Sequence, residues 1–172
     1  MNRMPTARVA ILGAESTGKS TLAEALAMRY QTLWVPEYLR EFVETHQRVP
    51  LEHEQYLIAA TQVERENTAT RQASRFLFCD TTPLMTAIYS DFYFGRVDDA
   101  LAALVRQRAY DFTIVTAPDS PWIADGLQRE SEAVRHVIHT QLLAALEEMG
   151  IRYLQVEGGL AQRVDRAMRF LL

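Results

Sequence analysis

The segment at residues 13–20 constrains this chain more than any other. It reads GAESTGKS and fits the phosphate-binding pattern GxxxxGK[ST] at every fixed position. Its Lys19 is the only lysine in the chain, and the other seventeen basic residues are all arginine. A compact ammonium suits the β- and γ-phosphates, and the larger planar fork of arginine is not an equivalent substitute. The sequence therefore predicts a phosphate site at this loop.

The residues on either side of the loop support the same interpretation. VAIL at 9–12 is a short apolar run typical of a buried parallel strand, and residues 21–27 are typical of a helix. A strand, a loop and a helix in this order direct backbone N–H groups and the positive helix end at a phosphate. We expect the nucleotide to be bound by Gly13, Glu15, Ser16, Thr17, Gly18, Lys19, Ser20 and Thr21.

Composition limits the class of protein. A chain of 172 residues that is 48% hydrophobic has enough apolar material for one domain, which we expect to span 1–172. The net charge is −4 and no basic run occurs, so nucleic acid is not an expected partner. No apolar stretch has membrane length or resembles a secretion signal, which predicts a cytoplasmic protein without a membrane partner. Cys79 lies in an apolar run and is expected to be a small buried side chain.

Apolar runs of strand length recur along the chain, and the segments between them have helical spacing. This alternation predicts an α/β fold with a parallel sheet and helices around it. Besides 9–12, the predicted strands are 32–35, 76–79, 112–116 and 152–156.

The predicted helices have recognisable ends. Thr82 followed by Pro83 is typical of an N-cap and a first helical position, and Ser131 can cap a helix that stops at Gly150. The stretch at 51–74 is polar and helical, and we expect it to lie partly away from the core. Its expected buried positions are Leu51, Tyr56, Leu57, Ala60 and Val63.

Phosphoryl transfer requires a metal-holding oxygen and a group that activates the acceptor, and each has a candidate. Ser20 follows the lysine and is the expected hydroxyl ligand of Mg²⁺. Asp80 ends the run at 76–79, at the sheet edge where open α/β folds bind ligands. Glu37 closes another strand and can accept the acceptor's proton. The alternative for Asp80 is a loop aspartate near the Thr82 cap. The alternative for Glu37 is a residue that only interacts favourably with the N-terminal dipole of the following helix.

The stretch at 117–130 joins proline, glycine and acidic residues around an apolar centre and is expected to form a lid. Arg129 is its cation and the best candidate to cover the phosphates, with Arg135 close behind. The alternative for either arginine is a solvated surface position. Arg163, after two glycines, is expected to flank the adenine.

Several further motifs run in order along the chain: GAESTGKST at 13–21, PEYLREFV at 36–43, CDTT at 79–82, and YDF at 110–112 with PWIADGL at 121–127. Together they resemble the ribosylnicotinamide kinase domain of the bacterial NAD-biosynthesis regulator. The resemblance implies ATP- and Mg²⁺-dependent phosphorylation of a hydroxyl of nicotinamide riboside to give the mononucleotide. It also implies a P-loop kinase fold with a five-stranded parallel sheet of order 2-3-1-4-5.

The acceptor implied by the resemblance is a cation through its pyridinium ring. Aromatic faces and carboxylates are therefore expected around it. Tyr89 and Asp91 belong to these types, and the main expected contacts are Glu37, Tyr38, Arg40, Trp122 and Asp125.

The chain departs from the family pattern in two ways. The regulator carries a nucleotidyltransferase domain and a DNA-binding segment ahead of its kinase, and we expect neither activity here. Gln128 stands where the family has an arginine directly after Asp-Gly-Leu, with Arg129 one place on. Two alternatives therefore stay open, a kinase of another nucleoside or small metabolite and a nucleotide-dependent regulatory ATPase or switch.

Overall fold

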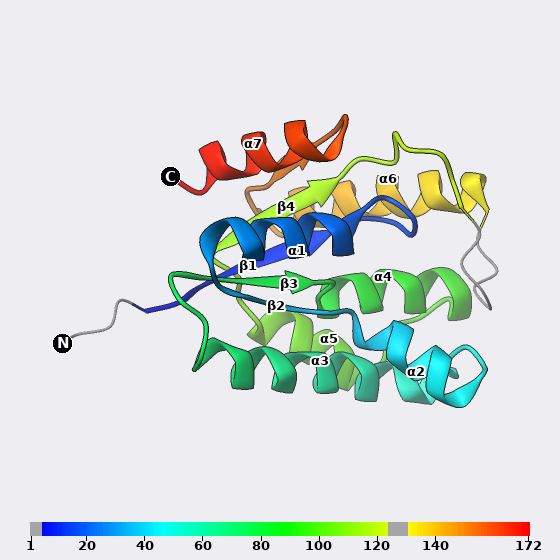
Figure 1. Ribbon diagram of the computed structural model, residues 1–172. Helices are drawn as coiled ribbons and strands as arrows, with labels where there is room; N and C mark the ends of the chain where they lie inside the picture. Colours follow the sequence, from blue (N-terminus) through cyan, green and yellow to red (C-terminus); the bar gives the residue numbers. More distant parts are fainter. Residues whose placement is uncertain (1–4, 124–130) are drawn as a thin grey trace.

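The computed structural model describes residues 5–123 and 131–172, which form a five-stranded parallel sheet between helices (Figure 1). The strand order is β2-β3-β1-β4-β5, so the predicted topology is confirmed. The strands are β1 Ala7–Leu12, β2 Leu33–Val35, β3 Phe76–Asp80, β4 Phe112–Thr116 and β5 Leu154–Val156. The helices are α1 Lys19–Tyr30, α2 Tyr38–His46, α3 Gln55–Thr70, α4 Pro83–Phe94, α5 Asp99–Gln107, α6 Glu132–Glu148 and α7 Leu160–Phe170, and a 3-10 turn spans Glu52–Glu54.

The two faces of the sheet carry separate apolar cores, because successive side chains of a strand point to opposite faces. Val9 and Ile11 of β1 pack with helices α1 and α7. Ala10 and Leu12 pack with α4 and α6 on the other face. Helices α3 and α5 extend this second layer beside β2 and β3 (Figure 1). No helix within the described residues has the length and apolar character needed to cross a membrane.

Helix ends follow the sequence signals. Thr82 is the N-cap of α4 and Pro83 is its first residue. The side chain of Ser131 caps α6 by accepting a hydrogen bond from the Val134 N–H at 3.2 Å. Helix α6 ends at Glu148, two residues before Gly150. Cys79 is fully buried, as expected.

The prediction for residues 51–74 is wrong about which helix face is buried. Leu51, Tyr56 and Leu57 are exposed, and α3 packs on the sheet and on helices α4 and α5. The buried positions are three or four residues apart and so lie on one helix face. Several of them are polar, and a prediction based on hydropathy alone therefore chose the wrong face. These buried positions are Gln55, Ile58, Ala59, Gln62 and Glu66.

Candidate active site

The candidate site lies where the strands of the parallel sheet end. The loop at 13–18 follows β1, Glu37 follows β2 by two residues, Asp80 is the last residue of β3, and Ala117 follows β4. Parallel strands present their carboxyl ends at one edge, which is where open α/β sheets bind ligands.

The loop between β1 and α1 requires glycine at two positions. A Cβ atom on Gly13 would lie 2.2 Å from Thr116 Oγ1, so no larger residue fits against β4. Gly18 has a φ of 86°, in the left-handed region that favours glycine, and α1 begins at the next residue. The loop thus turns sharply into the helix, and the first-turn N–H groups lack intrahelical acceptors.

Hydrogen bonds of buried hydroxyl groups hold this loop in place. Thr17 Oγ1 donates to the Ala14 carbonyl oxygen at 2.7 Å and lies 2.7 Å from Thr116 Oγ1. The ammonium of Lys19 donates to the same Ala14 carbonyl at 2.9 Å. An ammonium has three protons, so this contact leaves the lysine able to bind phosphate oxygens. The loop is a preformed cradle with its single ammonium inside.

Ser20 and Asp80, the two predicted metal ligands, are in direct contact. Ser20 Oγ donates to Asp80 Oδ2 at 2.6 Å, and Asp80 is completely buried. A hydroxyl and a carboxylate oxygen suit Mg²⁺, which in nucleotide sites is held by one or two protein oxygens, phosphates and water. No group of three His, Cys, Asp or Glu side chains among the described residues forms a complete protein cage. The oxygen pair therefore fits a metal that arrives with phosphates.

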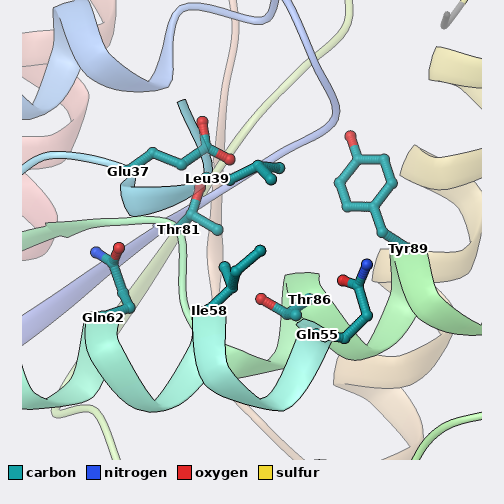
Figure 2. A pocket seen from close by; sticks show the side chains of 8 residues that line it. All are labelled: Glu37, Leu39, Gln55, Ile58, Gln62, Thr81, Thr86 and Tyr89. Carbon is teal, nitrogen blue, oxygen red and sulfur yellow. The ribbon is translucent and has the colours of Figure 1, made fainter. Parts of the chain in front are cut away.

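A pocket opens at Thr81, the residue after Asp80, between α3, α4 and the start of α2 (Figure 2). Glu37 lies at its rim, where it extends over Thr81. The Tyr89 hydroxyl accepts a hydrogen bond from the Glu15 N–H at 3.1 Å, which joins the pocket to the phosphate loop. The pocket is lined by Glu37, Leu39, Gln55, Ile58, Gln62, Thr81, Thr86 and Tyr89.

Three of the other predicted acceptor contacts, Tyr38, Arg40 and Trp122, do not line this pocket. The Tyr38 ring lies under the Arg65 guanidinium, 4.6 Å from its carbon, and Arg40 is exposed on α2. Trp122 is half-buried, and its indole nitrogen has no hydrogen-bond partner among the described residues. Asp125 lies outside the described residues. Of the five predicted contacts, Glu37 is therefore the one that the structure places at the pocket.

Arg163 is only 5% exposed and joins three loops. Its guanidinium donates to the carbonyl oxygens of Thr17, Ala117 and Gly158, at 2.5, 3.2 and 3.0 Å. It also lies 2.5 Å from Asp119, which accepts the Gly158 N–H at 2.6 Å. Burial opposes ionisation of Asp119, but the Gly158 N–H and the arginine outweigh it and lower the pKa of this carboxyl. The arginine holds the loops around the phosphate cradle; contact with adenine stays a prediction.

Arg135 is buried rather than solvated, with 1% exposure. From α6 it donates to the Ser16 carbonyl oxygen at 3.2 Å and to the Ser120 carbonyl oxygen at 2.8 Å. Ser16 Oγ in turn donates to the Ile123 carbonyl oxygen at 3.1 Å. The first part of the predicted lid is thus attached to the phosphate loop, whereas Arg129 lies outside the described residues.

The sequence analysis missed Thr116 and Gln62, which brace the site from within the core. Thr116 had a visible signal, because a polar residue ends the mostly apolar run at 112–116. The signal for Gln62 was weaker. Gln62 is three residues after Ala59 and seven after Gln55, a spacing that predicts that the three lie on one helix face.

The strand order, the glycine-rich loop and the Ser20–Asp80 pair define a protein of the P-loop nucleotide-binding class. The chain belongs to the AAA domain family, which matches residues 8–163.

Among characterised proteins, the chain is similar to the trifunctional NAD biosynthesis/regulator protein NadR. It is 34% identical to NadR of Escherichia coli K12 and 32% identical to that of Salmonella typhimurium LT2, in each case over 154 residues. The match covers 87% of this chain and 38% of NadR, so the chain spans well under half the length of these relatives. The predicted resemblance is therefore confirmed.

Solved structures share the fold. NadR in complex with NR superimposes with a TM-score of 0.83 and 22% identity, over 96% of this chain and 50% of that one. Deoxyadenosine kinase from M. mycoides superimposes with a TM-score of 0.66 and 12% identity, over 95% of this chain and 98% of that one. At these identities the likeness concerns the fold.

Proposed function

We propose that this domain is an ATP- and Mg²⁺-dependent small-molecule kinase that phosphorylates nicotinamide riboside to nicotinamide mononucleotide. The observation that carries the proposal is the convergence of the phosphate loop, the Ser20–Asp80 pair and Glu37 at one sheet edge, beside a pocket. The similarity to NadR supports the acceptor, because NadR has been solved in complex with NR.

Each proposed part has one task. The phosphate loop and Lys19 bind the β- and γ-phosphates of ATP, while Ser20 and Asp80 hold Mg²⁺. Bound Mg²⁺ neutralises charge on the transferring phosphoryl group. Glu37 accepts the proton of the acceptor hydroxyl. At the same time the oxygen of that hydroxyl bonds to the γ-phosphorus of ATP, and the bond from this phosphorus to the oxygen of the leaving ADP breaks. Arg129 and the buried Arg135 are the candidate cations on the lid side.

The pocket has the chemistry that a cationic nucleoside needs. Glu37 supplies a carboxylate at the rim and Tyr89 an aromatic face on one side (Figure 2). Amides and hydroxyls from Gln55, Thr81 and Thr86 offer partners for ribose hydroxyls. A cation over an aromatic face is stabilised by about 0.5 to 2 kcal/mol.

A kinase of another nucleoside is the second candidate, and the fold shared with deoxyadenosine kinase favours it. A regulatory ATPase is the third. An assay that follows both ADP and phosphorylated product separates the three. The kinase proposal predicts ADP release that depends on an acceptor and equals product formation mole for mole. ADP release at the same rate without any acceptor would contradict it.

A further inference from the structure

The backbones of β2 and β3 separate at the site. Their parallel pairing ends with Val35 opposite Cys79, and the next residues along the two strands are Pro36 and Asp80. Proline has no N–H group to donate, and the ladder of hydrogen bonds between these strands ends at this point. The separated segments, which we call the β2–β3 fork, carry Glu37 on one side and Asp80 on the other. The relative position of the two carboxylates is therefore not set by the sheet.

The amide of Gln62 lies inside the β2–β3 fork. Its Oε1 accepts the Tyr38 N–H at 2.8 Å, and its Nε2 donates to the carbonyl oxygens of Pro36 at 3.3 Å and Asp80 at 3.2 Å. The side chain is 3% exposed and rises from α3 toward the loop that carries Glu37 (Figure 2). Both amide protons are used within the protein, so one glutamine holds the residues before and after Glu37 and also the backbone of Asp80.

We propose that Gln62 is the positioning residue that sets Glu37 relative to the Ser20–Asp80 pair. This inference rests on the proposed function, in which the first carboxylate takes a proton and the second holds Mg²⁺. A misplacement of about 1 Å can lower a reaction rate by about 100-fold. Gln62 acts through the backbone of its neighbours and not through the substrate.

Two variants of Gln62 test the proposal. Gln62→Met keeps the length of the side chain but removes its donors and acceptor, and we expect kcat to fall by about 100-fold. The KM for ATP should change by less than about threefold, because the phosphate loop makes no contact through this side chain. The matched control is Glu66→Gln, a buried polar residue one turn further along α3 that bonds Tyr110 and Arg108 instead. This control should keep the wild-type kcat.

Gln62→Glu adds a pH readout that a packing role would not produce. An ionised carboxylate has no proton for the carbonyl oxygens of Pro36 and Asp80, whereas the protonated acid has one. The kcat of this variant, relative to wild type, should therefore rise as the pH falls. A wild-type kcat in Gln62→Met, or a loss that Glu66→Gln shares, would overturn the proposal.

Amide hydrogen exchange tests the same geometry without any assay of activity. Exchange at the Tyr38 N–H should be faster in Gln62→Met than in wild type or in Glu66→Gln, and unchanged exchange would overturn the inference. If wild type phosphorylates no acceptor but Tyr38 exchanges faster in the variant, the proposed function fails while Gln62 still fixes the β2–β3 fork.

Discussion

Ser20 and Asp80, sixty residues apart in the chain, meet through a 2.6 Å hydrogen bond between Oγ and Oδ2. Ser20 is in the first turn of α1, and Asp80 ends the neighbouring strand β3. Because strands β1 and β3 pair directly, the residues that follow one strand face the end of the other. The bond therefore joins the phosphate loop to the oxygen that we assign to Mg²⁺.

Replacement of Lys19 tests the phosphate cradle. Lys19→Ala should lower kcat/KM for ATP by about 100-fold or more, because a cation aimed at transferring phosphate is lost. The fold should remain, since the ammonium bonds a loop carbonyl and not the core. Lys19→Arg should recover little, because its planar fork differs in shape from an ammonium. Steady-state kinetics with circular dichroism as the folding control check this, and wild-type kinetics in Lys19→Ala would refute it.

The single lysine also gives a direct probe of binding. Reductive ¹³C-methylation of the protein labels one side-chain amine, that of Lys19, besides the chain terminus. The Lys19 signal should shift when ATP and Mg²⁺ are added. A terminal signal that shifts while that of Lys19 stays fixed would place the nucleotide elsewhere.

Asp80→Asn tests the metal assignment. The amide keeps the size of the side chain but removes its charge, so activity should fall by about 100-fold and half-maximal rate should need more Mg²⁺. Asp111→Asn is the matched control, because Asp111 bonds the Arg8 N–H at the opposite edge of the sheet. A magnesium titration of both variants checks this. An unchanged magnesium requirement in Asp80→Asn would remove Asp80 from the metal site.

Glu37→Gln separates proton transfer from nucleotide binding. The amide cannot accept the acceptor's proton, so kcat should fall by about 100-fold or more while the Kd for ATP stays near the wild-type value. Glu41→Gln is a nearby control, since Glu41 is exposed on α2 and paired with Arg65 of α3. Isothermal titration measures the Kd for ATP, and single-turnover kinetics measure the rate of phosphoryl transfer. Full activity in Glu37→Gln would assign the base to another group.

Glu66→Gln should change how stability depends on pH. Burial raises the pKa of Glu66 above its ordinary value, although the Tyr110 hydroxyl and Arg108 favour its ionised form. A raised pKa means that the folded state holds this proton more tightly than the unfolded chain does. The stability that it contributes is present below about pH 4.3 and is lost as the pH rises through the folded-state pKa.

The neutral glutamine has no such dependence. The unfolding free energy of wild type minus that of Glu66→Gln should therefore decrease as the pH rises above about 4.3. Urea denaturation at a series of pH values checks this. An increase in that difference would show that Arg108 outweighs burial.

Local patterns in the sequence were sufficient for most of the fold. Short, mostly apolar runs predicted all five strands, because strands covered on both faces are largely apolar along their length. The strand β4 has the predicted bounds. The strand order came from the family resemblance, since pairing between distant segments leaves no local pattern.

The buried polar contacts of the site were not predictable in this way. Gln62 is 26 residues from Pro36 and 18 from Asp80. Its spacing along the helix indicates a shared helix face but not which backbone groups the amide bonds. Arg135 similarly looks like a surface residue until α6 and the phosphate loop meet. By contrast, Ser20, Asp80 and Glu37 lie at or next to the ends of recognisable elements, and the fold brings these ends to one edge of the sheet.

The most direct test is the reaction itself, measured on the wild-type protein with ATP, Mg²⁺ and purified acceptors. We expect nicotinamide mononucleotide to form from nicotinamide riboside, with kcat/KM at least about tenfold above that for uridine or cytidine. That ratio corresponds to ~1.4 kcal/mol, the scale of one contact between a cationic ring and an aromatic face. Equal or faster phosphorylation of a neutral nucleoside would contradict the proposed acceptor.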